Sequence, residues 1–165
     1  MNRGANMNIG SENGAAPLNA AALNGHVEII LKLLDHGAGV DIADDEGFTP
    51  LYTATTNGYL KALRELLNRG AKVDIANREG FTPLYSAVSS GHVELVRELL
   101  KHGAILDITK ESGWLLFNVA SQTEKLEVIR VLLKHALGEN ISKLCVWKTV
   151  EKAAKMEILK VFDIG

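Results

Sequence analysis

Residues 47–76 read GFTPLYTATTNGYLKALRELLNRGAKVDIA, and residues 80–109 read GFTPLYSAVSSGHVELVRELLKHGAILDIT. The second stretch repeats the first after 33 residues, and the same step separates the three prolines of the chain, Pro17, Pro50 and Pro83. Alanines and paired leucines keep this step through four copies. A fixed step held at so many positions predicts an array of equivalent structural units.

Each unit carries the signals of two short helices and a loop. In the first quoted stretch Thr49 is a good N-cap, and Pro50 suits the first helical position, where its missing N–H costs no helical hydrogen bond. The first helix is expected to run to about Asn57, which a glycine follows. Leucines at helical spacing then predict a second helix, and Gly70 is expected in the left-handed position beyond its end. Residues 71–81 predict an extended, hairpin-like loop.

The pattern D-x-x-G-x-T-P-L-x-x-A, G-H-x-E, L-L and G-A-x-V-D resembles the ankyrin repeat. Residues 44–76 and 77–109 match it almost completely, and residues 14–43 match it well. Residues 112–136 keep the frame but lack several signature residues, so the resemblance covers roughly residues 11–137. It implies an all-α, ankyrin-type solenoid of stacked helix–turn–helix units with projecting hairpin-like loops.

The step of the repeat also predicts how the chain is divided. We expect a flexible segment at 1–10, repeats at 11–43, 44–76, 77–109 and 110–137, and a degenerate helical C-terminal cap at 138–165. A cap is expected because the ends of a stack expose apolar faces and need modified units. The cap residues expected to pack inward are Trp147, Val150, Ile158, Leu159 and Phe162. No polar cap precedes the first unit, which leaves open that the chain is a fragment of a longer array.

Composition narrows the classes of function. The 165 residues have a formal net charge of −2, so no overall field favours nucleic acid or an anionic membrane. The lysines of the C-terminal tail are nearly balanced by acids, which favours a solvated helix face. The single cysteine, Cys145, cannot form an internal disulfide, which favours a reducing compartment. We expect a cytoplasmic protein, with the nucleus left open, that does not insert into membranes.

The five histidines are in phase with the repeat. His26 and His92 stand at the start of a predicted second helix, while His36, His102 and His135 stand in its last turn. Their spacing therefore follows from the repeat, and helix capping accounts for them better than a metal site. Because phosphate-binding glycine motifs and a nucleophile with an oriented base are also missing, we expect no catalytic residue, no cofactor and no metal.

By the resemblance, loop tips and the exposed sides of the first helices line one concave face, on which a protein partner docks. The candidate partner-binding residues in the loops are Asp45, Glu46, Phe48, Arg78, Glu79, Phe81, Ser112 and Trp114. Those on the first helices are Thr56, Ser89 and Gln122.

Aromatic residues recur within this set. Phe48, Phe81 and Trp114 share one phase, and such a column could anchor a partner, because aromatic side chains dominate binding hot spots. The alternative is that each ring leans on the next loop and stiffens the array. Tyr52 and Tyr85 stand where the family commonly has histidine, and we expect a structural role for them.

Three classes of function follow. The first is a non-catalytic, monomeric protein–protein interaction module. The second is a regulatory or targeting ankyrin segment of a larger enzyme or channel. The third is an independent enzyme or nucleic-acid binder, which only the lysine-bearing tail and the acidic loop support.

Overall fold

A computed structural model describes residues 7–107, 111–122 and 126–137 of the chain. Within these residues all regular structure is helical, and the chain separates into two compact units, residues 1–104 and 105–165. The expected cap, with its inward-facing residues, and Cys145 lie outside the described residues.

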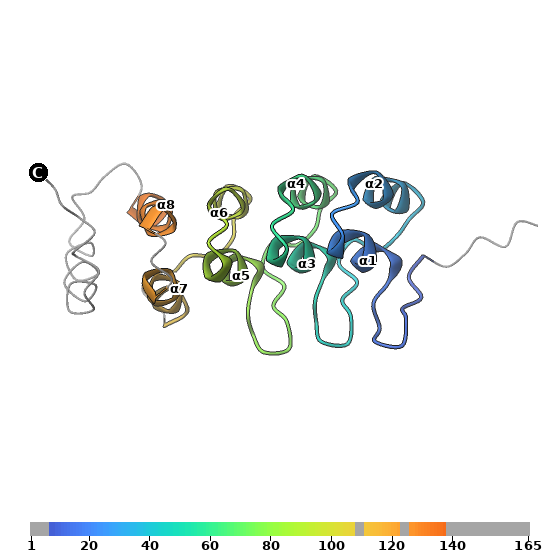
Figure 1. The fold of residues 1–165 in the computed structure, drawn as a ribbon, viewed down its shortest axis with the longest axis horizontal. Coiled ribbons are helices and arrows are strands. Elements are labelled where there is room, and N and C mark those ends of the chain that lie inside the picture. The colour runs from blue at the N-terminus through green and yellow to red at the C-terminus, as the bar shows by residue number, and fades with distance from the viewer. Residues whose placement is uncertain (1–6, 108–110, 123–125, 138–165) are drawn as a thin grey trace, which may run out of the picture. The chain divides into compact units, whose positions relative to one another are not determined.

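The first unit contains three helical pairs. Its helices are α1 (Pro17–Leu23), α2 (Val27–Asp35), α3 (Pro50–Thr56), α4 (Leu60–Asn68), α5 (Pro83–Ser90) and α6 (Val93–Lys101). Figure 1 shows α1, α3 and α5 in one row and α2, α4 and α6 in a second row, with the loops projecting beyond the first row. The helical, stacked-repeat fold expected from the sequence is therefore confirmed.

Local chemistry sets the helix ends as predicted. Oγ1 of Thr49 accepts a hydrogen bond from the backbone N–H of Tyr52 at 3.1 Å, directly before the proline that begins α3. Thr82 caps α5 in the same way at 3.3 Å. Gly70 has φ +85°, a left-handed conformation that glycine adopts without a steric cost.

The core of the first unit lies between its helices. The largest fully buried side chains include leucines at equivalent positions, such as Leu51 and Leu84, and Leu66 and Leu99. α3 packs against both α1 and α5. Ala54 and Ala87 are wholly buried, and their small side chains allow this close approach.

Each loop is held by an internal cap and by its neighbour. Oδ1 of Asp44 accepts the N–H groups of Glu46 and Phe48 at 3.0 and 2.8 Å, and Asn77 does the same one unit later, at 3.1 and 2.9 Å. The N–H of Asp45 donates to the Asn13 carbonyl at 3.1 Å, and that of Arg78 to the Glu46 carbonyl at 3.0 Å. Successive loops are therefore linked through their backbones.

The second unit contains α7 (Glu111–Gln122) and α8 (Leu126–Leu137), which pack together around the buried Ala120. Ser112 and Trp114 lie within α7, although the 33-residue step places them in a loop. The reason is that Leu115 and Leu116 replace the threonine and proline that begin the earlier first helices. Without proline every N–H here can join a helix, which therefore starts before Leu115.

The histidines are not all caps, which corrects the sequence interpretation. Nδ1 of His36 and of His102 lies 2.7 and 2.9 Å from the carbonyl oxygen four residues earlier, as expected for a residue at a helix C-terminus. The side chains of His26 and His92 form no capping hydrogen bond. The His92 ring instead lies against Gly58 in the turn of the preceding repeat, so close that an added Cβ would be 3.0 Å from Cε1.

Candidate functional site

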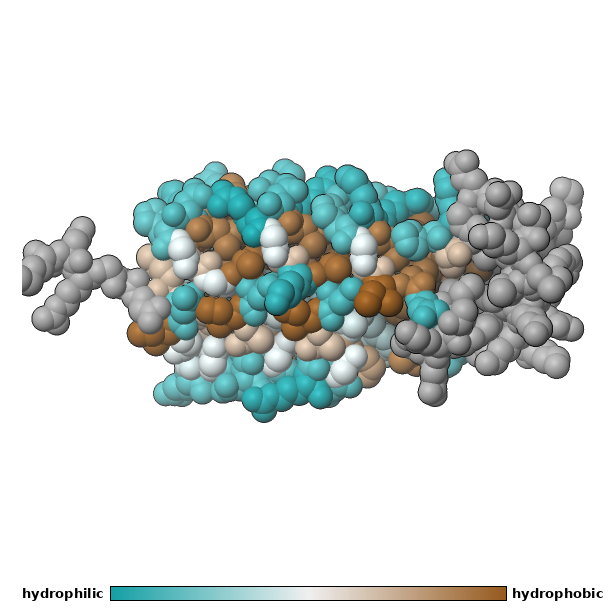
Figure 2. Space-filling view, turned by 180° about the vertical axis from the view of Figure 1, so that it is seen from behind, coloured by the Kyte–Doolittle hydropathy of each residue, from teal (hydrophilic) through white to brown (hydrophobic). Residues whose placement is uncertain are grey.

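The candidate site is built on the charge distribution of the first unit. α1, α3 and α5 contain no charged residue, whereas α2, α4 and α6 contain many. The loop tips, residues 11–14, 44–47 and 77–80, carry further charges. Figure 2 shows one face, seen from behind, with hydrophilic residues along its upper and lower edges and apolar residues between them, interspersed with hydrophilic ones.

Exposed residues recur on the loop tips and first helices. We call them the loop-and-helix face, which consists of Leu23, Asp45, Glu46, Thr56, Arg78, Glu79 and Ser89. Six of the seven are among the predicted partner-binding residues. Phe48 and Phe81, also predicted, are half-buried beside this face. Gln122 is exposed on α7, and the side chains of Ser112 and Trp114 lie outside the description.

Phe48 and Phe81 each stack on a tyrosine of the same repeat. The ring centroids of Phe48 and Tyr52 are 5.0 Å apart, with an angle of 27° between the rings. Those of Phe81 and Tyr85 are 4.2 Å apart, at 16°. Each ring therefore contacts the first helix of its own repeat, and the alternative in which it leans on the next loop and stiffens the array stays a prediction. A binding role for the exposed part of each ring stays a prediction.

Below this face, buried polar groups connect neighbouring repeats. Burial raises the pKa of the Tyr52 phenol, and a hydrogen bond with Ser86 of α5 partly offsets that rise. Asn19, in the same position of the first repeat, is 4% exposed, and its Nδ2 donates to the Phe48 carbonyl at 2.7 Å. These contacts give Tyr52 the structural role expected of it and make Asn19 its counterpart.

A pocket of about 200 Å³ opens between α1 and α3. It is lined by Leu23, Phe48, Tyr52, Thr53, Thr56 and Asn57, and its surface is almost wholly apolar. The sequence interpretation missed Leu23, which is 53% exposed. Its position could have been found from the sequence, because Leu23 is the equivalent, one and two repeat steps earlier, of the predicted binding residues Thr56 and Ser89.

Acidic residues predominate at the loop tips. Five carboxylates, those of Glu12, Asp44, Asp45, Glu46 and Glu79, stand there with the single guanidinium of Arg78. Asp44 is occupied by the two backbone N–H groups of its own loop. Asp45 and Glu46 are exposed, and neither forms an ion pair within the described parts of the chain.

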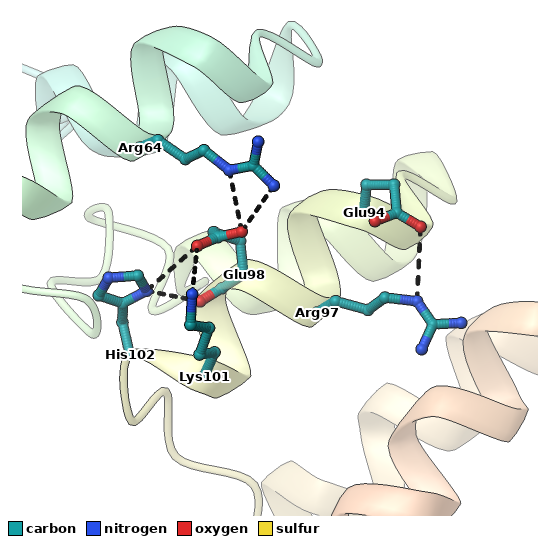
Figure 3. A network of polar contacts seen from close by, with 6 residues as sticks. All are labelled: Arg64, Glu94, Arg97, Glu98, Lys101 and His102. Carbon is teal, nitrogen blue, oxygen red and sulfur yellow. Dashed lines mark hydrogen bonds and ion pairs between the residues drawn. The ribbon is translucent and has the colours of Figure 1, made fainter.

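Another cluster of charges, on the second helices, is structural. Oε2 of Glu98 in α6 receives Nε and Nη2 of Arg64 in α4 at 3.0 and 2.9 Å, while Lys101 and His102 approach Oε1 at 3.5 and 3.8 Å (Figure 3). Burial alone raises the pKa of the Glu98 carboxyl, but the hydrogen bond and charge of Arg64, helped by Lys101, hold that pKa below its usual range. The cluster ties α4 to α6.

Two negative findings apply to the described residues. Their histidine, aspartate and glutamate side chains form no group of three that could hold a metal ion. None of their helices combines the length and apolar character needed to span a membrane.

Comparison with known proteins identifies the repeat. A family model described as ankyrin repeats, in three copies, matches residues 1–77 and 70–144. No curated protein matches the chain.

Proposed function

Because the chain belongs to the ankyrin-repeat family, whose members are generally protein–protein interaction modules, we propose that it binds a protein partner through its loop-and-helix face. The family is typically non-catalytic, and we propose the same of this chain.

One observation carries the choice of face. In α3 and α5 the framework residues that recur at every step, such as Leu51, Ala54 and Ala87, are buried, while Thr56 and Ser89 are exposed. Packing therefore explains the framework residues and leaves the exposed ones unexplained. Together with the loop tips they supply adjacent apolar, hydroxyl and charged groups, the mixture that specific interfaces use.

Site-specific photo-crosslinking tests the proposal. The photoreactive residue p-benzoylphenylalanine is placed at Ser89 or Arg78 on the loop-and-helix face, or at Lys61 or Glu94 on the second helices as controls. All four positions are exposed. After irradiation in a cell lysate, we expect discrete protein adducts from the first two variants and few from the controls. Equal labelling from all four, or no adduct from Ser89 and Arg78, would refute the proposal.

A further inference from the structure

We propose that the partner segment presents one aliphatic side chain to the pocket between α1 and α3, and lysines or arginines beside it to the acidic loop tips. This inference rests on the proposed function and specifies the chemistry of the partner.

The pocket selects an apolar group because its surface is almost wholly apolar and two of its polar groups are already hydrogen-bonded. The hydroxyl of Thr56 donates to the Tyr52 carbonyl at 3.1 Å and lies 2.8 Å from Oγ of Ser86. Nδ2 of Asn57 donates to the Thr53 carbonyl at 2.8 Å. A polar side chain entering the pocket would lose its water and gain little in exchange. An aliphatic one would lose no hydrogen bond and would cover the exposed half of Leu23.

The size of the pocket limits the occupant to a single side chain. A closed apolar cavity of about 150 Å³ holds a benzene molecule. The open pocket, at about 200 Å³, therefore has room for one leucine, isoleucine or methionine side chain.

Charge complementarity selects what stands beside the aliphatic residue. Asp45 and Glu46 are exposed carboxylates without an ion pair among the described residues. The first helices hold no cation, and Arg78 is the single cation of the loop tips against five carboxylates, so a basic partner meets a net negative charge. Phe48 joins the two features, since its side chain lines the pocket while its N–H binds Asp44 of the acidic loop. Opposite charges of this kind steer association and disfavour acidic partners.

Peptide selection on the full chain tests the proposal. Random displayed dodecapeptides are selected for binding, and their affinities are measured by fluorescence polarisation. We expect the selected peptides to share one leucine, isoleucine or methionine flanked by at least two lysines or arginines. Selection of acidic or uncharged peptides, or of no peptide, would overturn the proposal.

Paired variants show whether the pocket and the acidic loop tips are what binds the selected peptides. Leu23→Ser should weaken binding of the selected peptides by about tenfold, whereas Ile29→Ser, which removes an aliphatic residue of similar exposure (48%) from α2, should change it less than about twofold. Asp45→Asn with Glu46→Gln should weaken binding and flatten its salt dependence. Glu28→Gln with Glu94→Gln, on α2 and α6, should do neither. Equal effects within either pair would overturn the proposal.

These results separate the partner chemistry from the proposed function. Thermal unfolding of each variant, followed by circular dichroism, identifies any loss of folding. If adducts form from Ser89 and Arg78 while the selected peptides lack the basic and aliphatic pattern, binding through the face stands and only the stated partner chemistry fails. If those adducts are absent, the proposed function itself fails.

Discussion

Asn19, Tyr52 and Tyr85 occupy the same position of successive repeats but hold different loops. The short amide of Asn19 reaches the Phe48 carbonyl in the loop of the next repeat. The tyrosine rings stack on the phenylalanine of their own loop, and Tyr52 hydrogen bonds to Ser86 of the next first helix. One side chain at this position therefore decides whether a first helix is tied to the loop before it, the loop after it, or the neighbouring helix.

Glu98 offers a prediction at the same scale. Glu98→Gln keeps the shape of the side chain but removes the charge that Arg64 binds. We expect a loss of about 1–2 kcal/mol in the free energy of unfolding at neutral pH, the size of a hydrogen-bonded ion pair with one half-exposed member. Urea unfolding followed by circular dichroism measures it. Glu94→Gln is the control, because its ion pair with Arg97 is exposed and should contribute less than about 0.5 kcal/mol.

The effect of Glu98 should also depend on pH. Its pKa in the folded chain lies below the ordinary value of 4.5, so its stabilising contribution is fully present above pH 4.5 and is lost as pH falls through the folded pKa. The difference in unfolding free energy between the wild type and Glu98→Gln should therefore narrow as the pH is lowered below 4.5. A difference that stays constant down to pH 3 would contradict the role assigned to Arg64.

Among the elements, those governed by local chemistry could be predicted from the sequence. The sequence placed the start of α3 at Pro50 and its end near Asn57, because a threonine cap, a proline and a glycine act within a few residues. The start of α7 could not be predicted from the step, since the cap and proline are replaced there. The pairing of Phe48 with Tyr52 depends on side-chain rotamers, and the pocket is formed by two neighbouring repeats. Neither could therefore be predicted from the sequence of a single repeat.

Two glycines that follow helices, one between α3 and α4 and one after α4, give an element-scale prediction with a built-in control. Gly58 and Gly70 both have positive φ, at +76° and +85°. An added Cβ at Gly58 would meet the His92 ring, whereas at Gly70 nothing lies within 4 Å. Gly70→Ala should cost about 1–2 kcal/mol from backbone strain alone, and Gly58→Ala should cost more. The double change Gly58→Ala with His92→Ala tests the contact, because losses that are merely additive in urea unfolding would show that the ring does not matter.

Because the first helices pack closely, the stability of the chain should depend strongly on the size of the side chains between them. Ala87→Leu should destabilise the chain by about 1–3 kcal/mol, because Ala87 is wholly buried and α5 packs on α3. Ser89→Leu adds a leucine to the same helix at an exposed position and should change stability by less than about 0.5 kcal/mol. Thermal unfolding of the two variants compares them directly, and similar melting temperatures would contradict this packing.

At the scale of the first unit, stability comes from contacts between neighbouring repeats. α4 packs on α2, α3 and α6, whereas α2 packs mainly on α1 and α4. Ile29 of α2 is 48% exposed, while its equivalents Ala62 and Leu95 are 0% and 4% exposed. In an array stabilised by nearest neighbours, a repeat covered on both sides is held more firmly than one covered on a single side. The middle repeat should therefore be the most resistant to local unfolding.

Substitutions of Leu33 and Leu66, equivalent residues of α2 and α4, test whether the middle repeat is more stable than the first. Leu66 is wholly buried and Leu33 only half-buried. Leu66→Ala should cost about 2–5 kcal/mol, and Leu33→Ala clearly less, because water already reaches part of its surface. Urea unfolding gives both values, and amide hydrogen exchange should show α3 and α4 protected longer than α1 and α2. Equal losses from the two substitutions, with uniform protection across the four helices, would mean that the repeats unfold as one block rather than as a chain of neighbours.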